Sequence, residues 1–516
     1  MEFVGLTARP KTATPAAPAA SSSVGGCTIS TQVLRKTPVV PPCSLTFSVI
    51  KGMYNVRVAD ISPAVLKEVT EALTAKPRVN ASYGGGKPVT YPLYSLSKTW
   101  LSVPRFYGLQ RFGQCAESRL VDGQPVQLTL TVSPRPYQVP VLNALRGVFA
   151  GCDAVGAGAL LEADCGVGKT FMGIAATVAH GKKTAVVVHK GDLQDQWKER
   201  FATFAPTARV GIVRSDTIEV DGYDVVIFMA QSVCSGRYDA DRERVFGSFG
   251  LLIVDECHHW AAPTLSKTMS RFPARCVLAL SATPDRKDGL GFVLPYFFGP
   301  TVARVKRNST GKLRVEIINV SSGKAREIRL RNGRTCLPKT ITMMVEDPAR
   351  NRMLAEKVVA LHGEGRSVIL MSDRRKHLVE LRRVLVEDLS VGEDLVGMYV
   401  GETSKRGIAR REAQRSRPIL LATTRMAEEG FDEARLDTLV FSTPKSSIEQ
   451  CVGRIQRSHP DKKEPLVIDY VDTYAGGAMY GMARARENFY EACGFTVVKH
   501  RSGSGGDRQN SLLRYC

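Results

Sequence analysis

The feature that most constrains this chain is an eight-residue stretch, Ala163-Asp-Cys-Gly-Val-Gly-Lys-Thr170. A short apolar run, Ala159–Leu161, precedes it, and a helical pattern over 171–180 follows. A strand that leads through a glycine-rich turn into a helix surrounds a phosphate with backbone N–H groups and the positive end of the helix dipole. We therefore expect this stretch to hold a polyphosphate, with Lys169 at the β/γ-phosphates and the Thr170 hydroxyl on Mg²⁺.

The other residues expected to bind the nucleotide within this stretch are Ala163, Asp164, Cys165, Gly166, Val167 and Gly168. The strict pattern for such a loop has glycine in place of Ala163. On this motif alone, a chance glycine turn stays open as the alternative.

The charge of the chain indicates a polyanionic partner. Its 71 Lys and Arg residues exceed its 50 Asp and Glu residues, which gives a net charge of +21. Such an excess suits nucleic acid or an anionic membrane. No apolar run approaches the roughly 18 residues that a membrane span needs, so we expect nucleic acid as the partner and no membrane.

Cysteine usage and the N-terminus indicate the compartment. Twelve cysteines include no CxxC pair, and the adjacent His258 and His259 lack a second ligand pair nearby. Free thiols in a reducing compartment are the simplest interpretation. No charged segment followed by an apolar core opens the chain, so we expect an intracellular protein, cytoplasmic or nuclear (or in a viral compartment or virion), and not a secreted one.

Two sets of short apolar runs alternate with helical patterns. The first set comprises 159–161, 184–188, 210–213, 224–228, 251–254 and 276–280; the second comprises 367–371, 397–400, 419–422, 438–441 and 466–470. Nearly continuous apolar strands separated by helices predict parallel sheets that are buried on both faces. In the helix after 184–188, Asp192 is expected to cap, and Leu193, Trp197 and Phe201 form a core-facing stripe.

These patterns divide the chain into a disordered arm over 1–40, an accessory α/β module over 41–128, a first α/β domain over 129–303, a basic connector over 304–345, a second α/β domain over 346–500 and a flexible tail over 501–516. Aromatic and basic residues interleave between Tyr91 and Phe112 in the accessory module. These residues could bind nucleic acid by stacking on its bases. We favour the alternative that they form the core of a small module. For the connector, a nucleic-acid-facing edge and a solvated linker stay equally open.

Two acids follow the apolar run Leu251–Val254. At the carboxyl edge of a parallel sheet, Asp255 would face the phosphate loop and hold Mg²⁺. Glu256 would orient and deprotonate the attacking water. Ser281-Ala282-Thr283 follows run 276–280, and its two hydroxyl groups can exchange hydrogen-bond partners.

The strongest signal in the second domain is Gln450-Cys-Val-Gly-Arg-Ile-Gln-Arg457. On a helix, Gln450, Arg454 and Arg457 fall at i, i+4 and i+7 and therefore share one face. Two guanidinium groups without an acid suit the charge that develops on a γ-phosphate, as arginine fingers. Gly453 lets this face approach another surface closely. In the first domain, the Gln138 amide matches the N6/N7 edge of adenine.

Together these motifs resemble superfamily 2 ATP-dependent helicases and translocases, nearer the XPB and UvsW groups than the DEAD-box RNA helicases, and similar to versions in large double-stranded DNA viruses. The resemblance is carried by Gln138 (Q motif), 163–170 (motif I), 187–197 (motif Ia), 255–258 (motif II), 281–283 (motif III), 371–375 (motif IV), 422–432 (motif V) and 450–457 (motif VI). His258 departs from the DEAD-box pattern, which has Asp there.

The resemblance implies two tandem RecA-like domains with ATP and Mg²⁺ between them. It implies coupling residues at His258, Ser281, Ala282 and Thr283, and further nucleotide contacts at Gly430 and Asp432. The nucleic-acid contacts that it implies are His189, Lys190, Gln231, Ser372, Arg374, Thr423 and Thr424.

We therefore expect an ATP hydrolase that moves on or unwinds nucleic acid, with DNA favoured over RNA, in transcription or in recombination and repair, and with transcription, replication or repair proteins as partners. An RNA helicase, or a nucleic-acid-binding protein whose ATPase is regulatory, stays open as the alternative. An inactive ATPase would be expected to have lost Lys169, Glu256 or Arg457, and all three are present.

Overall fold

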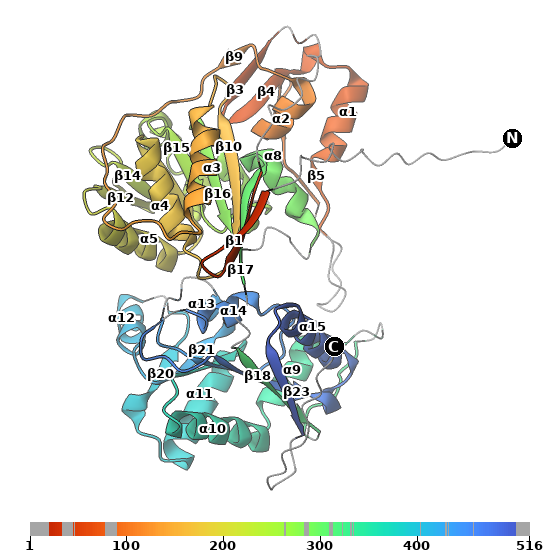
Figure 1. The fold of residues 1–516 in the computed structure, drawn as a ribbon. Coiled ribbons are helices and arrows are strands. Elements are labelled where there is room, and N and C mark those ends of the chain that lie inside the picture. Colours follow the sequence, from red (N-terminus) through yellow and green to blue (C-terminus); the bar gives the residue numbers. More distant parts are fainter. Residues whose placement is uncertain are drawn as a thin grey trace, which may run out of the picture.

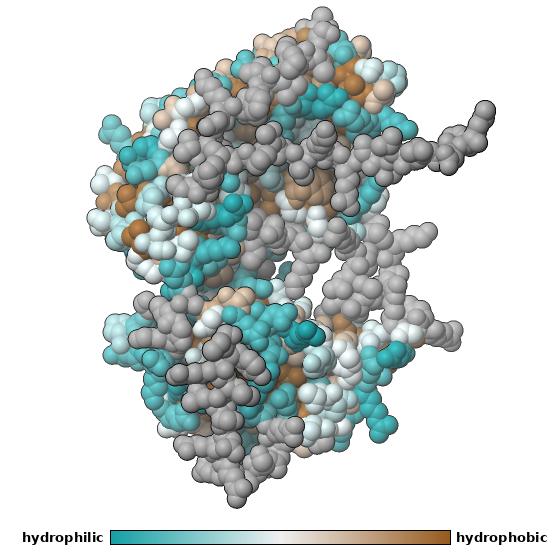
Figure 2. All heavy atoms as spheres, turned by 45° about the vertical axis from the view of Figure 1, so that its right-hand side comes forward, coloured by the Kyte–Doolittle hydropathy of each residue, from teal (hydrophilic) through white to brown (hydrophobic). Residues whose placement is uncertain are grey.

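The computed structural model describes residues 20–32, 45, 47–77, 90–262, 265–282, 288–308, 313–321, 323–330, 333, 335–402, 404–428, 431, 433–457 and 459–501. They form two halves, each built on one large sheet with helices on its faces (Figure 1). In the space-filling view the surface narrows between the halves (Figure 2). Within the described part of the chain, no helix combines the length and apolarity that crossing a bilayer requires.

The first half contains a ten-stranded sheet in the order β1-β2-β17-β10-β16-β15-β11-β14-β12-β13. Its parallel strands are β10 (Ala157–Ala163), β11 (Thr184–Val188), β12 (Val210–Arg214), β14 (Val225–Met229), β15 (Leu251–Val254), β16 (Cys276–Ser281) and β17 (Thr301–Arg307). Antiparallel strands β1 (Ala20–Val24), β2 (Cys27–Thr31) and β13 (Thr217–Ile218) lie at the edges. All six strands expected in the first domain are present.

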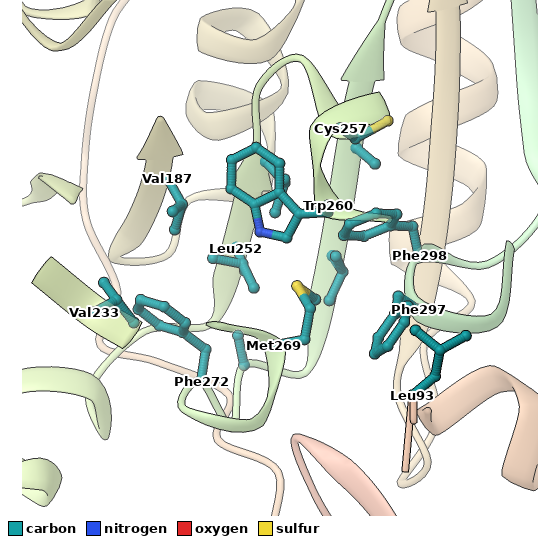
Figure 3. Close-up of a cluster of buried hydrophobic side chains, with 14 of the residues drawn as sticks. Leu93, Val187, Val233, Leu252, Cys257, Trp260, Met269, Phe272, Phe297 and Phe298 are labelled. Carbon is teal, nitrogen blue, oxygen red and sulfur yellow. The ribbon is translucent and has the colours of Figure 1, made fainter. Parts of the chain in front are cut away.

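Helices cover both faces of this sheet, which explains why its strands are almost wholly apolar. Alternate residues point to opposite faces: Leu161 and Val186 pack with α3 (Val139–Ala150), α4 (Lys169–His180) and α5 (Gly191–Phe204). On the other face, Leu160 and Val187 pack with α6 (Ala230–Cys234), α7 (Arg242–Phe246) and α8 (Leu294–Phe298). Figure 3 shows Trp260 beside Phe298 within this second core.

The accessory module packs on the same core. Its sheet has the order β7-β8-β4-β3-β9 and consists of β3 (Ser48–Lys51), β4 (Met53–Arg57), β7 (Ser95–Leu96), β8 (Trp100–Val103) and β9 (Glu117–Ser118). The module also contains a two-stranded sheet of β5 (Thr74–Ala75) and β6 (Tyr91–Pro92). Its helices are α1 (Pro63–Ala72) and α2 (Arg105–Phe112). Tyr91, Tyr107 and Phe112 are buried, and the Arg105 Nη1 donates to the Ala274 carbonyl at 2.9 Å. These buried residues therefore belong to the core, as the favoured interpretation expects, whereas Tyr94 and Trp100 of the same cluster are half-buried.

The second half contains a seven-stranded, wholly parallel sheet in the order β20-β21-β19-β22-β23-β18-β24. The strands are β18 (Arg314–Val320), β19 (Val368–Ser372), β20 (Val396–Tyr399), β21 (Ile419–Thr423), β22 (Thr438–Phe441), β23 (Leu466–Asp472) and β24 (Thr496–Arg501). Its helices are α9 (Leu337–Val345), α10 (Pro348–Gly363), α11 (Arg375–Arg383), α12 (Lys405–Ala413), α13 (Thr424–Glu428), α14 (Glu449–Arg454) and α15 (Gly477–Ala492). All five strands expected in the second domain are present.

The structure corrects two of the expected segments. Residues 20–31, placed in the disordered arm, form a hairpin whose strand β2 pairs with β17. This pairing satisfies the backbone of a sheet edge that would otherwise lie open. Parts of the expected connector over 304–345 also belong to the two halves, because β17 lies in the first sheet, β18 lies in the second, and α9 packs in the second half.

One expected helix cap is wrong. Asp192 lies in the first turn of α5, after Lys190 at the N-cap position, and makes no cap. Its carboxylate instead accepts a hydrogen bond of 3.0 Å from Arg411 on α12, which joins the two halves. The apolar stripe of Leu193, Trp197 and Phe201 on α5 is buried as expected.

Candidate nucleotide site between the two halves

The phosphate loop has the geometry that the sequence predicts. Strand β10 ends at Ala163 and α4 begins at Lys169. Between them, Gly166 and Gly168 adopt φ angles of +83° and +87°. Glycine reaches this left-handed region without the clash that a Cβ introduces. The two glycines therefore allow the chain to turn sharply from β10 into α4.

Hydrogen bonds from both sides fix the loop. The carboxylate of Asp164 accepts the Arg307 backbone N–H at 2.8 Å. The carbonyl of Val167 accepts the Gln138 amide N–H at 3.0 Å and the Tyr137 hydroxyl at 3.3 Å. These three hydrogen bonds tie the loop to β17 and to the segment before α3.

Lys169 lies across its own loop and donates from Nζ to the Ala163 carbonyl at 3.1 Å. Burial disfavours its charged form, but nearby negative groups, including the carboxylates of Glu256 and Asp255, outweigh burial and raise the pKa of Lys169. The ammonium group is therefore charged at neutral pH. Thr170 follows it and lines the same cavity.

Asp255 lies directly after β15 and is buried. Its Oδ2 accepts from the Trp197 indole at 2.8 Å, and its Oδ1 accepts the Glu256 backbone N–H at 2.9 Å. Burial and the charge of Glu256 raise the pKa of the Asp255 carboxyl. Asp255 and Thr170 face one cavity and offer hard oxygen atoms, so these residues fit Mg²⁺.

Glu256 has an unusual backbone, with φ +45° and ψ +52°. This conformation is strained for a residue with a side chain and is found at functional sites. Its Oε2 is buried without a hydrogen bond from the described residues and lies 3.4 Å from the His258 Nδ1. Burial opposes ionisation, but Lys169, His258 and Arg454 outweigh it and lower the pKa of Glu256. The carboxylate is therefore a charged acceptor at the cavity.

The predicted coupling residues connect neighbouring strands. The His258 Nδ1 lies 3.1 Å from the Ser281 hydroxyl, which ends β16. Ala282 follows and is buried, whereas Thr283 lies outside the described residues. The contact between His258 and Ser281 thus connects the segment after the acidic pair to β16.

The second half brings two arginines to this cavity, but not on one helix face. Helix α14 ends at Arg454, so Arg457 lies beyond it and the predicted common face is wrong. Gln450 is half-buried on α14 and is not among the residues that line the cavity. Arg454 donates to the carbonyls of Ala427 at 3.0 Å, Phe431 at 2.7 Å and Glu428.

Arg457 also lies close to the phosphate loop. Its Cγ lies 3.9 Å from a Cβ built on Gly166. Burial, together with the charges of neighbouring arginines such as Arg200, lowers the pKa of Arg457 to about 10. The guanidinium group is therefore still charged at neutral pH.

Gly453 permits the approach of the two halves. A Cβ built on Gly453 would lie 2.7 Å from the Cβ of Cys165 in the phosphate loop, closer than such atoms pack. The surface that Gly453 was expected to approach is thus the loop itself.

The Gln138 amide is placed differently from its expected role. Its Oε1 accepts the Arg135 backbone N–H at 2.9 Å, and its Nε2 donates to Val167. Both polar atoms are therefore bonded to the protein and hold the phosphate loop. Gln138 still lines the cavity.

Most of the predicted nucleotide-site residues line one cavity of about 370 Å³. Its lining includes the predicted residues Gln138, Cys165, Gly166, Gly168, Lys169, Thr170, Asp255, Glu256, Arg454 and Arg457. It also includes Arg200 and Arg307, which the sequence did not identify as site residues. The sequence assigned Trp197 no role at the nucleotide site, although the polar end of its indole was a signal that it could bond a buried acid.

The residues expected to contact nucleic acid lie at the carboxyl ends of β11, β14, β19 and β21. Ser372 and Thr424 are buried, and His189 is buried with its ring 4.1 Å from that of His259. Gln231 is exposed, and its Nε2 donates to the His189 carbonyl at 2.7 Å. Lys190, Arg374 and Thr423 are half-buried. Gly430 and Asp432 lie outside the described residues.

Residues 131–286 match the family described as "Type III restriction enzyme, res subunit". The chain is 27% identical over 449 residues to "Putative ATP-dependent RNA helicase L396" of Acanthamoeba polyphaga mimivirus, covering 85% of this chain and 84% of that protein. It is 24% identical over 373 residues to "Putative ATP-dependent RNA helicase QP509L" of African swine fever virus (strain Badajoz 1971 Vero-adapted), covering 66% of this chain and 69% of that protein.

Among solved structures, S. cerevisiae Dbp5 bound to RNA and ADP BeF3 aligns with a TM-score of 0.50 at 13% identity, covering 71% of this chain and 90% of that chain. This likeness concerns the fold alone and confirms two tandem RecA-like domains. The family and viral matches confirm the resemblance to superfamily 2 helicases, including those of large DNA viruses, and an ATP-dependent enzyme of the helicase class.

Proposed function

We propose that this protein is a nucleic-acid-stimulated ATPase that uses hydrolysis to translocate on or unwind DNA. The observation that carries the proposal is the single cavity in which Lys169 and Glu256 of the first half meet Arg454 and Arg457 of the second. A site built from both halves is complete only when they are together, so nucleotide chemistry can drive their relative movement.

The residues divide the reaction between them. Lys169 and the loop N–H groups bind the β/γ-phosphates, and Glu256 accepts the proton of the attacking water. Arg457 stabilises the charge that develops on the transferred phosphoryl group. Thr170 and Asp255 would hold Mg²⁺, which neutralises phosphate charge when bound. Arg454 positions the end of α13 and the segment that follows it through its three carbonyl contacts.

Nucleic acid would lie along the carboxyl ends of the parallel strands, near Lys190 and Gln231 in the first half and Arg374 and Thr423 in the second. The net charge of +21 supports a phosphate-binding surface. Because Ser372 and Thr424 are buried, contacts at those two positions would use the backbone.

RNA is the second candidate substrate. The names of the mimivirus and African swine fever virus relatives refer to RNA helicases, which favours it. The resemblance of the motifs to the XPB and UvsW groups favours DNA. We infer a role in transcription or in recombination and repair, where both substrates occur.

The test is steady-state ATP hydrolysis with no polymer, single-stranded DNA, duplex DNA, forked DNA and RNA in parallel. The Lys169→Ala variant is the control for contaminating ATPase. Stimulation by a DNA substrate above that by RNA would support the proposal, and stimulation by RNA alone would establish the second candidate. Equal rates with and without every polymer would contradict both.

A further inference from the structure

Arg307 is fixed at the edge of the candidate nucleotide site by backbone contacts on both sides. It ends β17, and its N–H donates to the Asp164 carboxylate at 2.8 Å. The next N–H, of Asn308, donates to the Gly26 carbonyl at 2.9 Å in the turn of the β1–β2 hairpin. The strand end is therefore clamped between the phosphate loop and the N-terminal hairpin.

The side chain of Arg307 extends to the cavity. Its Nη1 is buried and has no hydrogen-bond partner among the described residues. A Cβ built on Gly166 would lie 3.7 Å from this Nη1 and 3.9 Å from the Cγ of Arg457. Two arginines, one from each half, thus flank the exposed glycine of the phosphate loop.

Such a guanidinium group is unfavourable without a ligand, because a buried N–H that lacks an acceptor loses its bonds to water. The neighbouring positive charge of Arg457 adds repulsion. A group that supplies several anionic oxygens relieves both penalties, and a guanidinium binds phosphate oxygens in a fixed, often bidentate geometry. A polyphosphate in the adjoining loop meets this requirement.

We propose that Arg307 is a further polyphosphate-binding residue, supplied by the same half that carries the phosphate loop. This inference rests on the proposed nucleotide-binding function of the cavity. Because Arg307 and the loop belong to one sheet, their contact does not depend on closure of the two halves. Arg307 therefore contributes to the affinity for bound nucleotide, whereas Arg457 acts when the second half is in place.

The experiment measures the affinity of the full chain for AMP, ADP and a non-hydrolysable ATP analogue by calorimetric titration. Wild type is compared with Arg307→Ala, Arg307→Lys and the matched control Lys306→Ala. Lys306 is the preceding residue of β17, is exposed and does not line the cavity, so its loss removes the same charge from the strand. Thermal unfolding without nucleotide verifies that each variant folds.

We expect Arg307→Ala to weaken binding of the ATP analogue and ADP by about 10- to 100-fold, the range for losing hydrogen bonds to a charged group. The loss for AMP should be smaller, and Lys306→Ala should bind as wild type does. The affinity of Arg307→Lys should lie between those of wild type and Arg307→Ala, because lysine keeps the positive charge and loses the planar guanidinium that can bind two oxygens at once. In hydrolysis, Arg307→Ala should raise KM for ATP more than it lowers kcat.

Wild-type affinity in Arg307→Ala would overturn this inference and leave the proposed function intact. An equal loss for AMP and the ATP analogue would also overturn it, because it indicates a structural role without phosphate recognition. If Arg307→Ala does not fold, the affinities of Arg307→Lys for AMP, ADP and the ATP analogue are compared with those of wild type in its place. Failure of wild type to bind any of the three nucleotides would overturn the proposed function itself, and this inference with it.

Discussion

The indole Nε1 of Trp197 donates a 2.8 Å hydrogen bond to the Oδ2 of Asp255, so a core residue of α5 holds the carboxylate that follows β15. Both residues are buried. Burial and Glu256 raise the pKa of Asp255, while the Trp197 hydrogen bond acts in the opposite direction and favours the charged carboxylate. Trp197 therefore helps to keep Asp255 ionised, the form that binds Mg²⁺.

We expect Trp197→Phe to shift the acidic limb of the kcat/KM profile for ATP to higher pH. Removing the donor raises the pKa of Asp255 further, so the carboxylate is protonated at a higher pH and activity is lost earlier on acidification. At neutral pH we expect activity to fall about 10-fold, in line with a lost hydrogen bond to a charged group. The control is Phe201→Leu, which perturbs the same core stripe without touching Asp255; an unshifted limb in Trp197→Phe would contradict this role.

Lys169→Ala and Glu256→Gln should fail at different steps. Lys169→Ala removes the cation from the phosphate loop and should weaken nucleotide binding as well as hydrolysis. Glu256→Gln keeps the size of the side chain, so it should bind ATP and accumulate a closed complex on nucleic acid while losing turnover. Nucleotide titration and nucleic-acid binding with ATP present measure the two effects. Normal turnover by Glu256→Gln would show that another group is the base.

Arg454→Ala and Arg457→Ala should also differ. Arg454 bonds three backbone carbonyls, so its loss should lower the free energy of unfolding by about 2–4 kcal/mol, as for a broken network of charged hydrogen bonds. Arg457→Ala should lower kcat by ~10³-fold with little change in melting temperature. Chemical denaturation and steady-state kinetics separate these outcomes. A near-normal kcat in Arg457→Ala would exclude it as an arginine finger.

Gly453→Ala should hinder the approach of the halves, because the new Cβ would lie 2.7 Å from the Cβ of Cys165. We expect kcat to fall about 10-fold or more while the affinity for nucleotide, which the first half binds, changes less. The double variant Gly453→Ala/Cys165→Gly removes the opposing atom and should recover part of the rate. A single variant with wild-type kcat would show that hydrolysis does not need this contact.

Binding of nucleic acid should weaken steeply with salt. With a net charge of +21 we expect the chain to contact several phosphates, and each contact adds ~0.7–0.9 to the slope of log affinity against log salt concentration. Fluorescence anisotropy with single-stranded and duplex DNA between low and moderate salt measures this slope. A slope near zero would contradict a surface that follows the phosphate backbone.

The sequence by itself determined the strands and the phosphate loop. Thr184–Val188 and Leu251–Val254 have the predicted bounds, because a strand covered by helices on both faces must be apolar at every position. Gly166 and Gly168 were equally recognisable, since the backbone of a phosphate loop needs a conformation that other residues avoid. The apolar strand positions and the loop glycines are required by local structure, so a local sequence pattern is enough to predict them.

Only the tertiary structure decided which distant residues complete the site. The spacing of Arg454 and Arg457 fits a helix face, but α14 ends at Arg454, so contacts with the first half decide where Arg457 lies. Arg307 reaches the cavity because β17 pairs with β10 and β2. The local sequences of these strands do not predict that pairing. The reason is physical: such contacts depend on which surfaces are buried together in the folded chain, and this depends on all the elements at once.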